Sequence, residues 1–216
     1  MLNTLIIKEL RNELRTKETF FSMMTLGIVL IFLFSISSSN INTKQSIAFF
    51  WITIFIISSF GLYRSYQIEK DLDAFTSILS SPVDPGLVFL SKAISFFIVI
   101  TSISILLSPT AFFFLKIQLN NLFVIMMLSF GTNMFLSLLG NIICSMTLRS
   151  KNNEMIIPIL LFPFSIPMLL SIIKVTQSIS DGATFITYSN WIFLIIASNI
   201  LFLVIGIWSY NDIIKE

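Results

Sequence analysis

The sequence contains no histidine, one cysteine and few charged residues, which make up 11% of its 216 positions. The single cysteine, Cys144, excludes a disulfide within the chain. No cluster of histidine, cysteine and carboxylate suits a metal ion, and no nucleophile lies beside a base. No glycine is followed by lysine, so the G-x-x-x-x-G-K-[ST] phosphate loop is absent. We therefore predict a chain that is not an enzyme and binds no metal, ATP or other cofactor directly.

The scarcity of charge places the chain in a lipid bilayer. A soluble domain carries about 25% charged residues, whereas this sequence is 56% hydrophobic, has a mean hydropathy of +0.93 and contains 23 phenylalanines. A soluble core of this size has no room for so much apolar surface. The net charge of +2 comes without a basic cluster beyond what membrane topology needs, so we predict no nucleic-acid partner.

Six apolar segments are long enough, or nearly so, to cross a bilayer, which takes about 20 residues. Backbone groups left unpaired in hydrocarbon are too costly, so each segment is expected to be a helix. We predict one transmembrane domain, 1–216, with an all-α, polytopic fold similar to the ABC-2 type of permease. The predicted spans are 20–36, 47–62, 87–115, 122–147, 155–173 and 188–210.

The distribution of lysine and arginine predicts that both termini are cytoplasmic. With the N-terminus inside, ten of the thirteen basic residues fall in inside segments, and only Lys44, Lys116 and Lys174 fall outside. The acidic residues also lie inside apart from Asp181, but the rule counts basic residues alone. We expect a multi-pass protein of the cell inner membrane, with the mitochondrial inner membrane as the alternative.

Residues 2–17 form a separate amphipathic element before the first span. On a helical wheel one side is apolar and the other is basic. The apolar side holds Ile6, Ile7, Leu10 and Leu14, and the basic side holds Lys8, Arg11 and Arg15. This pattern predicts a helix at the cytoplasmic headgroups, and the alternative is a plain charged tail.

The segment 63–86, between the second and third spans, carries a narrow apolar stripe at helical spacing. The stripe consists of Ile68, Leu72, Phe75 and Leu79. Pro82 ends this short helix, because proline disfavours helix in the residue before it, and Asp84 and Pro85 are typical of the N-cap and first position of the next helix.

This short helix has two interpretations. It is either a surface helix that links two spans or a coupling helix that docks on a soluble partner and passes its movement to the spans. Its acidic character favours the coupling helix, because helices that only lie on anionic lipid favour lysine and arginine. The predicted contacts with a partner ATPase are Glu69, Asp71, Leu72, Asp73, Phe75 and Leu79.

Two spans contain residues that affect helix packing. In 122–147, Gly140 and Cys144 are four apart, a small-xxx-small step that lets helices approach; the polar residues around them fit ordinary packing or a substrate path. In 155–173, Pro158, Pro163 and Pro167 each remove a backbone hydrogen bond. That span is either broken for movement or wrapped around a neighbour.

These elements together resemble the CcmB family, the haem exporter protein B of cytochrome c maturation. The resemblance covers nearly the whole chain, and its more specific parts are the L-x-S-P segment before the third span and the P-x-x-x-P of the fifth. The residues that carry it are KELRNELRTKE (8–18), EKDLD (69–73), LSSP (79–82), LSK (90–92), GTN (131–133), SLLGN (137–141) and LLFPFSIP (160–167). One departure is Asp73-Ala74, where the family usually has D-G; alanine favours a more continuous helix by about 1 kcal/mol.

The resemblance implies several partners. They are a CcmA-like ATPase subunit that binds ATP and engages this segment, CcmC- and CcmD-like membrane proteins, a CcmE-like haem chaperone, and a second copy of this chain. The family name implies haem export, but haem iron relies mostly on histidine, cysteine, methionine or tyrosine, and here histidine is missing and Cys144 lies within a span. We expect the complex, and not this chain, to hold the haem. The rival hypotheses are an ABC-2 exporter of lipid, drug or glycan and a scaffold without a motor.

Overall fold

The computed structural model describes residues 2–37, 42–71, 84–117, 119–147 and 153–215. These ranges consist of helices joined by short turns and connections, with no strand in any of them. The all-α prediction is confirmed. The helices are α1 (Leu2–Thr16), α2 (Glu18–Ser37), α3 (Thr43–Asp71), α5 (Pro85–Leu115), α6 (Leu119–Thr147), α7 (Asn153–Ser180) and α8 (Phe185–Lys215).

Six of these helices are long and apolar enough to cross a membrane, which confirms the predicted polytopic architecture. Each keeps its backbone polar groups paired along its own axis, as a lipid environment requires. Their apolar parts are Glu18–Ser37, Thr43–Ile68, Pro85–Leu115, Val124–Thr147, Ile157–Ser180 and Phe185–Tyr210.

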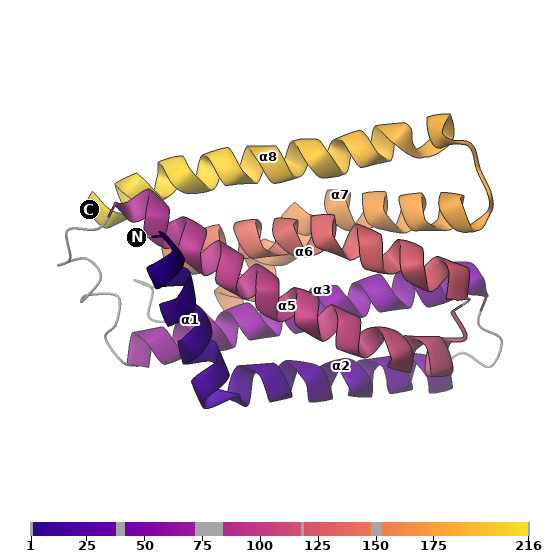
Figure 1. Ribbon diagram of the computed structural model, residues 1–216, viewed down its shortest axis with the longest axis horizontal. Coiled ribbons are helices and arrows are strands. Elements are labelled where there is room, and N and C mark those ends of the chain that lie inside the picture. The colour runs from indigo at the N-terminus through magenta and orange to yellow at the C-terminus, as the bar shows by residue number, and fades with distance from the viewer. Residues whose placement is uncertain (1, 38–41, 72–83, 118, 148–152, 216) are drawn as a thin grey trace.

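The six long helices run side by side and alternate in direction (Figure 1). Both chain termini lie at one end of the bundle, together with the end of α3, the start of α5 and the end of α6 (Figure 1). We call this end the terminal end and the opposite one the far end. The shared position of the termini follows from an even number of antiparallel spans.

Helix α6 lies at the centre of the bundle. It packs against α3, α5, α7 and α8, and 72% of its apolar window is buried, against 17% for α8 and 22% for α2. The central position explains its composition, because serine, glycine and asparagine let neighbouring backbones approach and offer hydrogen bonds where lipid offers none. The apolar side chains that α2, α7 and α8 expose form the surface that faces lipid.

Helix α1 lies across the bundle at the terminal end and packs against α5 and α2 (Figure 1). Lys17, with φ 50°, makes the sharp turn from α1 into α2. The predicted wheel of α1 differs from the structure at Ile7, among the residues whose side chains are described. Ile7 is 60% exposed, whereas Glu9 is half-buried. Glu9 lines a pocket that Lys92 of α5 also lines.

The segment 63–86 is divided between two helices. Residues 63–71 continue α3 without a break past the predicted end of the second span, and Pro85 begins α5. The predicted cap is confirmed: the Asp84 side chain accepts a hydrogen bond from the Gly86 amide at 3.0 Å, and Pro85 occupies the first turn. Residues 72–83 lie outside the described residues.

Candidate functional site

A chain of three hydrogen bonds joins α3, α5 and α6 near the terminal end. The Tyr66 hydroxyl on α3 donates to Asn141 Oδ1 on α6 at 2.6 Å. The Asn141 amide donates in turn to the Ser137 carbonyl at 2.7 Å, and the Ser137 hydroxyl donates to the Ala93 carbonyl on α5. All four residues are buried, so each bond replaces one that lipid could not supply.

A lysine of α5 lies beside the first residue of this chain of hydrogen bonds. Lys92 is only 5% exposed, and its Nζ lies 5.1 Å from the centre of the Tyr66 ring. An ammonium group over an aromatic face is attracted by the negative face of the ring, and the attraction strengthens away from water. We name Tyr66, Asn141, Ser137, Ala93 and Lys92 the polar clasp.

The polar clasp borders a small pocket. The pocket has about 20 Å³ of room for water, which is enough for roughly one molecule. It is lined by Glu9, Leu62, Ser65, Tyr66, Lys92, Ser95, Phe96 and Asn141. The carboxylate side chain of Glu9 from α1 and the ammonium side chain of Lys92 from α5 therefore border the same space, which explains why α1 turns Glu9, and not Ile7, toward the bundle.

Sequence reasoning missed the polar clasp. It counted Lys92 among the basic residues of the cytoplasmic side and did not predict that its side chain is buried in the bundle. The available signal was a lysine flanked by Ser91 and Ser95 in an apolar helix. An intramembrane charge of this kind faces the bundle interior and points to a function by default.

The predicted ATPase contacts lie at the end of α3 and beyond it. Glu69 and Asp71 belong to the last turns of α3, and their side chains are not among those described. Leu72, Asp73, Phe75 and Leu79 lie outside the described residues. The backbone of α3 does reach Asp71 at the terminal end (Figure 1), so this acidic stretch begins on a helix that continues from the second span.

Gly140 of α6 lies against Leu62 of α3. A Cβ atom placed on Gly140 would collide with Leu62 Cδ1 and press on Leu62 Cγ at 3.1 Å. Cys144, one turn further along α6, is fully buried. The contact between Gly140 and Leu62 is a close helix–helix approach of the kind that small residues permit.

Helix α7 continues through its three prolines from Asn153 to Ser180. Pro163 and Pro167 are exposed and Pro158 is half-buried, so two of the three missing backbone hydrogen bonds lie on the lipid side of the helix. On its inner side, Ser165 donates to the Leu161 carbonyl, and Ser171 donates to the Pro167 carbonyl at 2.7 Å.

A second set of polar contacts lies deeper in the bundle, between α6 and its neighbours α5 and α8. The Asn133 amide donates to Ser104 at 3.0 Å and to Thr101 at 3.3 Å. The Asn199 amide of α8 donates to the Gly131 carbonyl at 3.1 Å. Asn133 and Asn199 each keep a buried Oδ1 without a hydrogen-bond donor.

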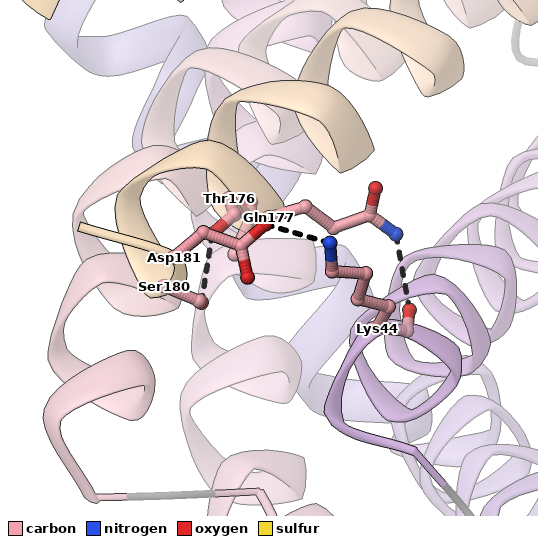
Figure 2. A network of polar contacts seen from close by, with 5 residues as sticks. All are labelled: Lys44, Thr176, Gln177, Ser180 and Asp181. Carbon is pink, nitrogen blue, oxygen red and sulfur yellow. Dashed lines mark hydrogen bonds and ion pairs between the residues drawn. The ribbon is translucent and has the colours of Figure 1, made fainter. Parts of the chain in front are cut away.

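The far end joins α3 to α7 by a different set of contacts (Figure 2). Lys44 forms an ion pair of 2.7 Å with Asp181, and Gln177 Nε2 donates to the Lys44 carbonyl at 3.2 Å. Within the bundle, Trp51 Nε1 donates to Thr176 at 3.2 Å. Asp181 and Gly182 form a turn, with Gly182 at φ 70°.

Among the described residues, no three histidine, cysteine, aspartate or glutamate side chains are placed to hold a metal ion. No curated protein matches the sequence. The sequence model of one family, described as CcmB protein, matches residues 1–215. The chain belongs to the CcmB family. The resemblance seen in the sequence is thereby confirmed over essentially its entire length.

Membership of the CcmB family, with the six apolar helices, makes the chain a membrane transporter subunit. CcmB proteins are the membrane subunit of the haem-exporter type in the ABC system of cytochrome c maturation. The polar clasp and the end of α3 are the parts of this CcmB-family chain whose geometry bears on how such a subunit works.

Proposed function

We propose that this chain couples ATP hydrolysis on a separate CcmA-like subunit to haem handling by CcmC-, CcmD- and CcmE-like partners. In this proposal, movement enters through Glu69, Asp71, Leu72, Asp73, Phe75 and Leu79, and the result is release of the haem-loaded chaperone. The observation that supports it best is that α3 continues from the membrane span to Asp71 as one helix. A continuous helix moves as a rigid rod, so force applied at its end reaches the bundle.

The division of roles has a chemical basis. The chain has no phosphate loop and no histidine, and its one cysteine is fully buried in α6. Nucleotide hydrolysis therefore has no phosphate loop in this chain, and iron ligation has neither a histidine nor an accessible cysteine, which leaves only methionine and tyrosine as ligands. We assign ATP hydrolysis and the haem ligands to other subunits. A second copy of this chain is proposed to complete the membrane unit.

The chain is extracted from its native membrane in mild detergent and purified together with its bound partners. Leu72→Asp with Phe75→Asp places two charges on the predicted apolar stripe and is expected to abolish copurification of the ATPase. Ser77→Asp with Ser81→Asp adds the same charge on the other side of the predicted stripe and is the matched control. An ATPase retained by the stripe variant at the level of the control contradicts the proposal.

The direct haem-binding alternative has its own measurement. Purified haem is added to the isolated chain and the Soret band is recorded. No stoichiometric shift is expected, because the described residues offer no histidine or accessible cysteine. A tight one-to-one shift would assign haem to this chain instead of to its partners.

A further inference from the structure

The helices on both sides of the predicted coupling segment meet at the polar clasp. Helix α3 ends at Asp71 and contributes Tyr66, and α5 begins at Pro85 and contributes Lys92 and Ala93. We propose that Tyr66, Asn141 and Lys92 are positioning residues that pass displacement of 72–83 to the central helix α6. This inference rests on the proposed function, since it assigns the internal path of the same coupling.

The arrangement of the helices calls for such a link. Helices α3 and α5 have few direct contacts with each other, whereas α5 packs extensively on α6. Asn141 lies between them: it accepts from Tyr66 on α3 and donates to Ser137, whose hydroxyl reaches α5. A shift of either flanking helix therefore acts on the same residue of α6.

Hydrogen bonds suit this role better than apolar contacts do. An apolar contact between helices has no preferred direction, whereas a buried hydroxyl that leaves its acceptor finds no replacement in lipid. The bond from Tyr66 to Asn141 is short, at 2.6 Å, and fully buried. The polar clasp thus keeps α3, α5 and α6 in register, and a large displacement moves them together or breaks the clasp.

Helix α1 borders the same path from outside. Glu9 lines the pocket beside Lys92, and the Ser95 hydroxyl donates to the Ile6 carbonyl at 3.4 Å. At its other end, the elbow into α2 is held by the ion pair of Glu18 with Arg64 of α3 at 2.7 Å. Helix α1 therefore contacts α5 through Ile6, and the elbow that follows α1 contacts α3 through Glu18.

The experiment compares product formed per ATP hydrolysed in the complete complex. The variants are Tyr66→Phe, which removes one hydroxyl, and Lys92→Met, which removes the charge but keeps the apolar stem. Tyr188→Phe and Lys174→Met make the same changes near the far end and are the controls. We expect cytochrome c matured per ATP to fall at least about fivefold in the clasp variants, with the ATPase still bound, and to be unchanged in the controls.

A conservative substitution distinguishes a positioning role of Lys92 from a role in stability alone. Lys92→Arg keeps a cation over the Tyr66 ring and is expected to restore most of the ratio. A ratio equal to that of the unmodified chain in Tyr66→Phe and Lys92→Met overturns the inference. The inference is also overturned if the ratio falls in proportion to the amount of assembled complex and Lys92→Arg does not restore it. That result assigns the polar clasp a structural role only.

A second measurement needs no cytochrome c. Ser65→Cys, in a Cys144→Ala background, places a thiol at the pocket, and its alkylation rate is measured with and without a non-hydrolysable ATP analogue. The rate is expected to change in the Tyr66 chain and to be constant in Tyr66→Phe. Equal changes in both refute the relay. An unmodified chain that brings down no ATPase refutes the proposed function itself, which distinguishes the two failures.

Discussion

Lys44 and Asp181 form an ion pair of 2.7 Å that joins the first turn of α3 to the residue that follows α7. Both side chains are largely exposed, at 61% and 51%, so water screens their attraction. The buried hydrogen bond from Trp51 to Thr176 joins the same two helices without such screening. The two contacts serve the same helix pair, and their surroundings decide how much each contributes.

These surroundings predict different costs for the two contacts. Asp181→Ala is expected to lower the free energy of unfolding by less than about 1 kcal/mol, and by less still at high salt. Thr176→Val, which keeps the shape but leaves the indole N–H of Trp51 without its acceptor, is expected to cost about 1–3 kcal/mol. Thermal unfolding in detergent at two salt concentrations measures both. A larger loss for Asp181→Ala contradicts this ranking.

Gly140→Ala is expected to destabilise the bundle by about 1–3 kcal/mol, because the added methyl group forces Leu62 out of its position. Leu62→Ala in the same chain makes room, so the double variant is expected to lose less than the sum of the single changes. Gly86→Ala is the control, since its Cβ meets nothing closer than 3.4 Å. Strict additivity at Gly140 and Leu62 would rule out this contact.

The orientation of the bundle is tested by labelling from outside intact cells. In a Cys144→Ala background, Gly182→Cys at the far end is expected to react with a membrane-impermeant maleimide. Lys8→Cys on α1, at the terminal end, is expected to react only after the cells are opened. Both positions are exposed, so access to the reagent depends on the side of the membrane. The reverse pattern would place the predicted coupling segment on the wrong side for a cytoplasmic ATPase.

The prolines of α7 are expected to lower the stability of the bundle and to favour the movement that its function requires. Pro163→Ala with Pro167→Ala supplies two backbone donors within a continuous helix and removes a helix breaker. We expect a higher melting temperature and a lower rate of cytochrome c maturation. A stabilised complex that works at the original rate would assign the prolines to packing alone.

The sequence predicted the spans because hydropathy is a local property. A window of about 20 residues contains all the information needed to place a helix in lipid, and the cap at Asp84 depends on neighbours only. The end of the second span was less predictable. Tyr63 and Arg64 looked like the start of a loop, but α3 continues to Asp71, because a helix need not end where the hydrocarbon does.

The polar clasp could not be predicted from the sequence, because its bonds join residues far apart in the chain. Tyr66 and Asn141 are separated by 75 positions, and nothing near either residue indicates the other. Lys92 illustrates the same limit, since its sequence neighbours fit a cytoplasmic position and its burial depends on α3 and α6.

The amino-acid sequence by itself determined that this chain is a helical membrane protein, and it carried the resemblance to the CcmB family. Those properties depend on composition and local sequence pattern, because lipid restricts which residues each span can contain. Only the tertiary structure decided that α6 is central and that Tyr66, Lys92 and Asn141 meet there. Packing in a bilayer is directed by close approach and by hydrogen bonds between helices, and both depend on which helices become neighbours.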